Sequence, residues 1–119
     1  MQTNGATSDF ARDGAVLIRG VLSADEIARL TQGIETNLAQ PGPLAALASD
    51  AADPGRFVED FCNWQRISEY EQTLRNSALP ALAAALMKST TARIYHDHFA
   101  GEGSGHTTAH AVASGSAFL

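Results

Sequence analysis

The stretch from Phe10 to Leu38 constrains the fold of this chain most strongly, because it predicts a strand, a turn and a capped helix in that order. Residues 15–18 read Ala-Val-Leu-Ile, an apolar run that is too short for a helix and has a glycine just before it and another just after Arg19. We therefore expect a short buried strand here, followed by a turn into the helix.

That helix has both a start signal and a stop signal. Glu26 stands three residues after Ser23, so each side chain can accept a hydrogen bond from the other residue's backbone amide, which is a capping box. Pro41 and Pro43 prevent the helix from continuing. Apolar residues at spacings of three and four predict one buried face, made of Ile27, Leu30, Ile34 and Leu38.

The rest of the chain predicts more helix and a further strand, and therefore an α+β fold. Helical turns are expected at 44–48, 66–76 and 78–88, the last with a proline in its first turn. Thr90–His98 has the alternation of a strand. Residues 1–8 and the glycine- and serine-rich stretch from Gly101 onward predict loose ends.

Composition narrows the class of protein. At 119 residues the chain is one domain or part of one. Its formal charge of −5 and its lack of any basic cluster argue against a nucleic-acid partner. With no bilayer-length apolar run and no signal peptide, we expect no membrane partner either. The single cysteine, Cys62, cannot form an internal disulfide and favours a reducing, cytoplasmic location.

Large aromatic side chains gather between Arg56 and Tyr70. Because each of them buries much apolar area, core packing is the favoured interpretation over direct ligand contact. They are Phe57, Phe61, Trp64 and Tyr70.

Five residues near the carboxyl end have the side chains that bind zinc or ferrous iron; they are His96, Asp97, His98, His106 and His110. In a strand, His96 and His98 would point to one face and Asp97 to the other, so all three could not hold one ion. The other two histidines stand in a stretch with no predicted scaffold. We therefore expect histidines of a pleated surface and no metal site or catalytic residue here. Cys62 lies among acidic residues, and we expect it to be packed and inert.

Three motifs resemble one family in their order and spacing. They are F-x-x-D-G-A-V-L-I-R-G-V-L-S-x-D-E-I from Phe10, R-F-V-E-D-F-x-N-W-x-R-I-x-E-Y from Arg56, and A-R-I-Y-H-D-H from Ala92. Together they are similar to the amino-terminal third of the phytanoyl-CoA dioxygenase family, over a range that ends at His98. The resemblance implies a double-stranded β-helix (a jelly-roll barrel of the cupin type) preceded by helices, of which this chain would hold the helical part and the first strands.

The same resemblance implies an oxygenase chemistry. Members of the family use Fe(II) and 2-oxoglutarate to hydroxylate a small-molecule or acyl substrate, and a His-x-Asp pair with a distant histidine holds the metal. Relatives continue past the third motif with a segment like Leu-Val-Lys-Glu-Pro-Gly-Thr and then Thr-Pro-Trp-His-Gln-Asp-Gln-Pro, whose His and Asp are metal ligands. This chain holds neither segment, so we expect it to bind no iron or 2-oxoglutarate tightly, and its cofactor-binding residues stay unassigned.

The last residues suggest why those segments are missing. Codons for Thr-Pro-Trp-His-Gln-Asp-Gln-Pro, read from two bases later, give Ala-Val-Ala-Ser-Gly-Ser-Ala, which is 111–117 of this chain. In the same offset frame, residues 102–106 are compatible with Lys-Asp-Pro-Gly-Thr. We therefore expect residues 1–98 to be the family-like part and 99–119 to be an irregular, frame-shifted tail. The alternative is a small, non-catalytic α+β binding module with a flexible tail, whose contact surface would be the aromatic patch between Phe57 and Tyr70.

Overall fold

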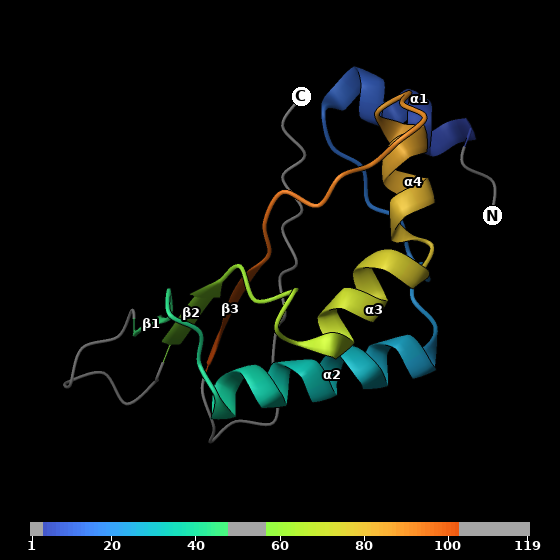
Figure 1. Ribbon diagram of the computed structural model, residues 1–119. Coiled ribbons are helices and arrows are strands. Elements are labelled where there is room, and N and C mark those ends of the chain that lie inside the picture. Colours follow the sequence, from blue (N-terminus) through green and yellow to red (C-terminus); the bar gives the residue numbers. More distant parts are fainter. Residues whose placement is uncertain (1–3, 48–56, 103–119) are drawn as a thin grey trace.

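The computed structural model describes residues 4–47 and 57–102, and it has the α+β class that the sequence predicts (Figure 1). Within those ranges the chain forms four helices and three short strands. In order they are α1 (Asn4–Asp13), α2 (Ala24–Ala39), β1 (Ala46–Leu47), β2 (Phe57–Phe61), α3 (Ser68–Asn76), α4 (Leu79–Leu86) and β3 (His98–Glu102).

The three strands form one antiparallel sheet in the order β1-β2-β3. In its register Glu59 pairs with Ala46 on one side and with Ala100 on the other, while Asp60 pairs with Phe99. Since side chains alternate along a strand, Glu59 and Asp60 point to opposite faces of the sheet. The sheet thus has two chemically different faces.

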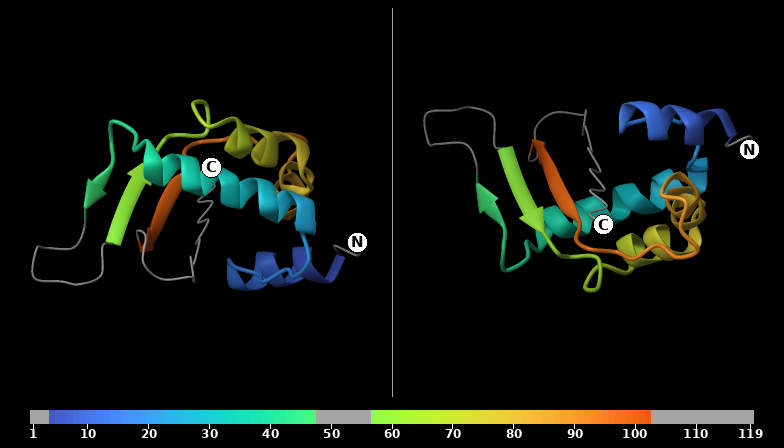
Figure 2. Two further views of the ribbon diagram at one scale, coloured as in Figure 1. Left: turned by 90° about the horizontal axis from the view of Figure 1, so that it is seen from below. Right: turned by 90° about the horizontal axis from the view of Figure 1, so that it is seen from above.

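The core lies where the Asp60 face of the sheet meets α2 and α3. Its buried apolar residues come from three separate parts of the chain, and they are Ile34, Ile67, Tyr70 and Phe99. Leu30, Leu38 and Trp64 pack against them. The figures show α1 and α4 beyond these elements, at the opposite end from the sheet (Figure 2).

The predicted cap of α2 is confirmed. Ser23 Oγ accepts from the Glu26 amide at 3.2 Å, and Glu26 Oε2 accepts from the Ser23 amide at 2.8 Å. The predicted apolar face is narrower than expected, because Ile34 is in the core with Leu30 and Leu38 against it while Ile27 is 53% exposed. Helices α3 and α4 also match their predictions to within a few residues, and α4 carries its proline in the first turn.

The two strands predicted from the sequence, at residues 15–18 and in the stretch before His98, are not present in the structure. Residues 15–18 have no strand assignment, and Leu17 is 76% exposed. Residues 90–97 are likewise irregular, and Tyr95 is 76% exposed. An apolar or alternating run only predicts a fit to a pleated surface, and strand structure also needs a partner backbone. Neither run lies beside a strand of the sheet.

Two helix-related expectations are also corrected. Residues 46–47, expected in a helical turn, form β1 because backbone pairing with β2 outweighs the helix propensity of alanine. Residues 4–8, expected to be loose, belong to α1, which packs against α4. Residues 49–55, whose serine, aspartate, proline and glycine are typical of a loop, lie outside the described residues.

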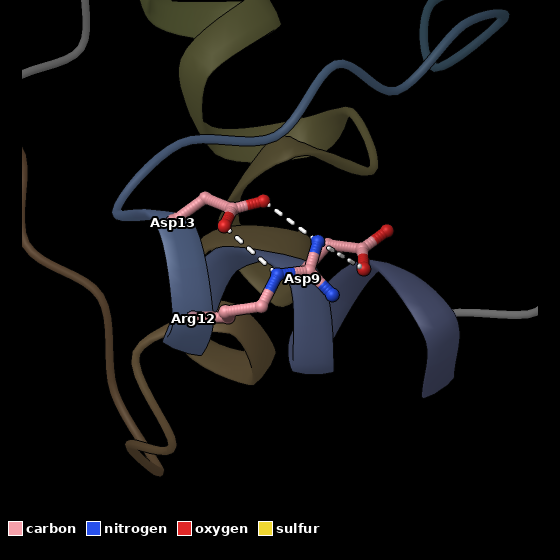
Figure 3. Close-up of polar contacts among 3 residues, drawn as sticks. All are labelled: Asp9, Arg12 and Asp13. Carbon is pink, nitrogen blue, oxygen red and sulfur yellow. Dashed lines mark hydrogen bonds and ion pairs between the residues drawn. The ribbon is translucent and has the colours of Figure 1, made fainter.

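The end of α1 carries a small exposed ion-pair network (Figure 3). Arg12 Nη2 lies 3.1 Å from Asp9 Oδ1, and the guanidinium donates to both oxygens of Asp13 at 2.8 and 2.7 Å. The hydrogen bond from Arg12 lowers the pKa of Asp13, and the bond to Asp13 raises the pKa of Arg12. Gly14 then ends the helix with φ +75°, and its amide donates to the Phe10 carbonyl at 2.8 Å.

The structure does not break at Phe99, where the sequence predicts an irregular tail to begin. Phe99 is buried in the core, and strand β3 continues through residues 99–102. Residues 103–119 lie outside the described ranges. In the parts of the chain that are described, no helix has the length and apolar character needed to cross a bilayer.

Candidate functional site

The third motif reaches back to the second through Asp97. Its Oδ1 accepts from the Trp64 amide at 2.9 Å, and its Oδ2 accepts from the Asn63 amide at 3.2 Å. The Asp97 backbone carbonyl accepts from the Cys62 amide at 3.0 Å. Three consecutive backbone N–H groups, 62 to 64, thus converge on one residue 33–35 positions further along. We call this arrangement the Asp97 clamp.

Beneath the clamp lies a buried polar cluster. Its members are nearly fully buried and come from α2, β2, the turn at 62–67 and α3. They are Asn37, Asp60, Asn63 and Tyr70. The guanidinium of Arg66 donates to two of them, Asn37 and Asn63. Arg66 donates to Asn63 Oδ1 at 2.9 and 3.2 Å. Asn37 Nδ2 donates to the Tyr70 hydroxyl at 3.0 Å.

Asp60 connects this cluster to the turn after α2. It is 1% exposed, its Oδ2 accepts from the Gly42 amide at 2.8 Å, and its Oδ1 accepts from the Phe61 amide at 2.9 Å. A Cβ at position 42 would overlap Asn63 Oδ1, so only glycine fits between the two polar side chains. The close approach explains why the chain turns on a glycine between Pro41 and Pro43.

Burial changes the acidity of one member of the cluster. Desolvation raises the pKa of Tyr70 above its usual value of about 10, and the hydrogen bond from Asn37 only partly opposes this effect. The phenol therefore stays neutral at physiological pH and serves as an acceptor.

The polar cluster and the clamp join secondary-structure elements and present no reactive group. Most of the buried polar atoms in the polar cluster and the clamp have an intramolecular partner, but Asn63 Nδ2 has none, and neither does His98 Nε2 on the sheet. Sequence reasoning missed Asn37, Asp60 and Asn63. A polar residue embedded in an aromatic run, as Asn63 is beside Trp64, was the signal available for this cluster.

The predicted metal-type residues do not come together. Asp97 is taken up by backbone amides, His98 begins β3, and His96 contacts the Tyr95 ring edge-on at 5.2 Å. Across residues 4–47 and 57–102 no three His, Cys, Asp or Glu side chains are placed to hold one metal ion. His106 and His110 lie outside the described residues. Cys62 is exposed with φ +60°, so the expectation that it is packed is wrong.

The predicted core packing of the aromatic patch holds for two of its four residues, Trp64 and Tyr70. Tyr70 is 7% exposed, and Trp64 lies against the core with the Arg75 guanidinium 5.3 Å from its ring centroid. Phe61 stacks on His98 with ring centroids 4.2 Å apart. Phe57, at 38% exposure, is the most open of the four. The patch is therefore not a continuous contact surface.

The sheet has a second face that holds none of the core residues, which we call the outer face. Its described side chains are Ala46, Phe57, Glu59, Phe61, His98 and Ala100. The glutamate carboxylate lies in the middle of this face, and Glu59 Oε1 is 3.7 Å from His98 Nε2. That distance is too long for a hydrogen bond. No protein-family model, curated protein or solved structure matches this chain.

Proposed function

We propose that this chain is the amino-terminal part of an Fe(II)/2-oxoglutarate-dependent oxygenase similar to the phytanoyl-CoA dioxygenase family, and that its reading frame changes near Phe99. The intact protein would hydroxylate a small-molecule or acyl substrate. The 119 residues contain no His-x-Asp, and the described residues offer no set of three metal ligands, so the printed chain does not fit the iron and should not turn over substrate.

The offset reading of the last residues carries the proposal. Each offset codon consists of the last two bases of one codon and the first base of the next. If the serines are encoded by TCN codons, the amino-acid sequence fixes the first and third bases of every offset codon from Ala111 to Ala117, and only the middle base is free. Every one of those fixed pairs agrees with Pro-Trp-His-Gln-Asp-Gln-Pro, including the single codon of tryptophan. Because two of the three bases of each offset codon are fixed, the match to the family segment depends only on the choice of the middle bases.

The offset frame also stays open over the span that joins the two family-like segments. From Phe99 to Ala111 no synonymous codon choice creates a stop codon in the offset frame. All stop codons begin with T, and the offset codons from Ala100 to Ala111 begin with another base. The offset codon at Phe99 begins with T, but its middle base is a pyrimidine, which no stop codon has. Val112 is the first position where a stop can arise, since GTA gives TAG and GTG gives the tryptophan codon TGG.

The arrangement of elements is consistent with the proposal. In the resembled family helices precede a β barrel, and here α1 and α2 precede the paired strands β1 and β2. The second and third motifs also meet in space, at the Asp97 clamp. These contacts give the motif residues a physical role in the fold.

The test is the nucleotide sequence at three codons. GTG at Val112, GCA at Ala113 and GGA at Gly115 would restore the Trp, His and Asp of the family segment. Any other codon at Ala113 or Gly115 removes a proposed metal ligand from the offset frame and contradicts the proposal. If the codons agree, a gene with the frame restored at codon 99 should yield a protein that binds Fe(II) and consumes 2-oxoglutarate, whereas the printed chain should do neither.

The exposed apolar side chains support the alternative of a small, non-catalytic binding module. Several large apolar side chains lie on the surface of the described part, namely Leu17, Ile27, Leu44 and Tyr95. An interaction domain would fold without the missing segment. Cooperative thermal unfolding of a monomer would favour this alternative, while aggregation through open strand edges and apolar surface would favour an incomplete barrel.

A further inference from the structure

We infer that the outer face of the sheet binds an organic cation of the methylated-ammonium class, with Glu59 as its counter-ion. The inference does not rest on the oxygenase proposal. It rests on the sheet register, on the composition of the three strands, and on the distance of 3.7 Å between Glu59 Oε1 and His98 Nε2, which is too long for a hydrogen bond.

The strand register places Glu59 between two alanines on the neighbouring strands and two phenylalanines on its own strand. Across the strands its neighbours are Ala46 and Ala100, whose side chains are single methyl groups. Along β2, the neighbours on the same face are Phe57 and Phe61, because side chains two residues apart point the same way. A carboxylate thus stands between two aromatic rings and two methyl groups.

This composition suits a cation with an apolar surface. A methylated ammonium group gains from the negative faces of aromatic rings and from a carboxylate, and it loses little when its own poorly hydrated methyl groups are covered. The Glu59 side chain is 35% exposed, so it is accessible to a ligand while partly shielded from water. A hard metal ion would need several oxygen ligands, and the described residues supply no such group.

His98 makes the site more rigid and lies beyond hydrogen-bond distance of Glu59. Its ring stacks on Phe61 with 15° between the planes, which fixes both rings beside the carboxylate. Its Nε2 is buried without a hydrogen-bond partner and stays 3.7 Å from Glu59 Oε1. No Lys or Arg occurs in β1, β2 or β3, so no fixed positive charge of these strands neutralises Glu59.

Choline is the probe, and 3,3-dimethylbutan-1-ol is its neutral control of the same shape. Each is titrated into the full 119-residue chain at pH 7.5 and constant ionic strength, and amide chemical shifts are followed by NMR. We expect saturable shifts with choline at residues 57–61 and 98–100, and weak, non-saturating shifts with the alcohol. Equal responses to both compounds, or shifts spread over the whole chain, would overturn the inference.

Two variants test the named groups. Glu59→Gln keeps the shape of the side chain and should weaken choline binding about threefold to tenfold, while Phe61→Leu should weaken it about threefold. The matched control is Glu35→Gln, which removes an exposed carboxylate of α2 and should leave affinity unchanged. An unperturbed amide spectrum for Glu59→Gln establishes that it folds. If Glu35→Gln weakens binding as much as Glu59→Gln does, choline responds to net charge only and the site is rejected.

Discussion

Asp97 Oδ1 accepts a hydrogen bond from the backbone amide of Trp64 at 2.9 Å, across 33 residues of sequence. The bond fixes the start of β3 against the turn that follows β2, because Asp97 immediately precedes His98. A residue that sequence reasoning examined as a metal ligand is therefore a structural acceptor. The motif in which it stands has a role in folding that needs no metal.

Asp97→Ala should destabilise the fold, because it leaves the amides of Asn63 and Trp64 without their acceptor. Two hydrogen bonds to a charged group at a part-buried site suggest a loss of about 2–3 kcal/mol in the free energy of unfolding. Urea unfolding followed by tryptophan fluorescence measures it. Asp13→Asn, at an exposed carboxylate that pairs with Arg12 on the surface, is the control and should leave the midpoint nearly unchanged. Equal midpoints for the two variants would contradict the clamp.

Stability should fall at alkaline pH through Tyr70. Its pKa is raised in the folded state, so the fold binds the phenol proton more tightly than the unfolded chain does. This contribution is complete below the unfolded pKa of about 10 and is lost as pH rises through the folded pKa. Thermal unfolding between pH 8 and 11 measures the decline.

Tyr70→Phe is the matched variant for that experiment. It should flatten the alkaline decline and should also cost about 1–3 kcal/mol at pH 7, because Asn37 Nδ2 loses its buried acceptor. A decline of the same steepness in this variant would show that another group is responsible.

Gly33 marks the closest approach of α2 to α3. A Cβ there would lie 2.9 Å from two Tyr70 ring carbons and 3.0 Å from Glu69 Cβ, and the Tyr70 ring cannot move without breaking its bond to Asn37. Overpacking of about 1–3 kcal/mol should exceed the gain of about 1 kcal/mol in helix propensity, so we expect Gly33→Ala to lower the melting temperature.

Gly5→Ala in α1 is the comparison, since nothing lies within 4 Å of the added Cβ. It should be neutral or stabilising by up to about 1 kcal/mol. A Gly33→Ala protein as stable as Gly5→Ala would mean that the two helices are not so closely packed.

The capping box of α2 predicts a pair of unequal effects. Ser23→Ala should cost about 1 kcal/mol, because the Glu26 amide loses its acceptor. Glu26→Gln should cost less, because a glutamine side chain can still accept from the Ser23 amide. Chemical denaturation of both variants compares them, and an equal loss would show that the Glu26 charge matters more than the hydrogen bond.

The sequence was a good guide to whatever depends on neighbouring residues. The cap at Ser23, the end of α2 before Pro41, and the proline in the first turn of α4 are local signals, and all three are present in the structure. Residues 15–18 and 90–97 were wrongly expected in strands because pairing depends on a distant backbone, which no local pattern reveals. The composition of β1 favours a helix, and only its pairing with Glu59 and Val58 makes it a strand.

The candidate site shows the same division. The strand geometry used to judge the metal-type residues 96–98 is absent, because residues 90–97 are irregular. Spacing could not indicate that Asp97 would bind the amides of 63 and 64, because that contact joins two motifs that are far apart in sequence. The outer face depends on the register of three strands, and so could not be predicted either.

The Asp97 clamp has a kinetic consequence. Its three backbone partners are 33 to 35 residues away, so the contact closes a long loop that contains α3 and α4. Closing such a loop costs chain entropy before any hydrogen bond compensates for it, which favours the formation of the local helices first. The clamp would then close on the native side of the rate-limiting barrier, where it would govern how slowly the chain unfolds and have little influence on how fast it folds.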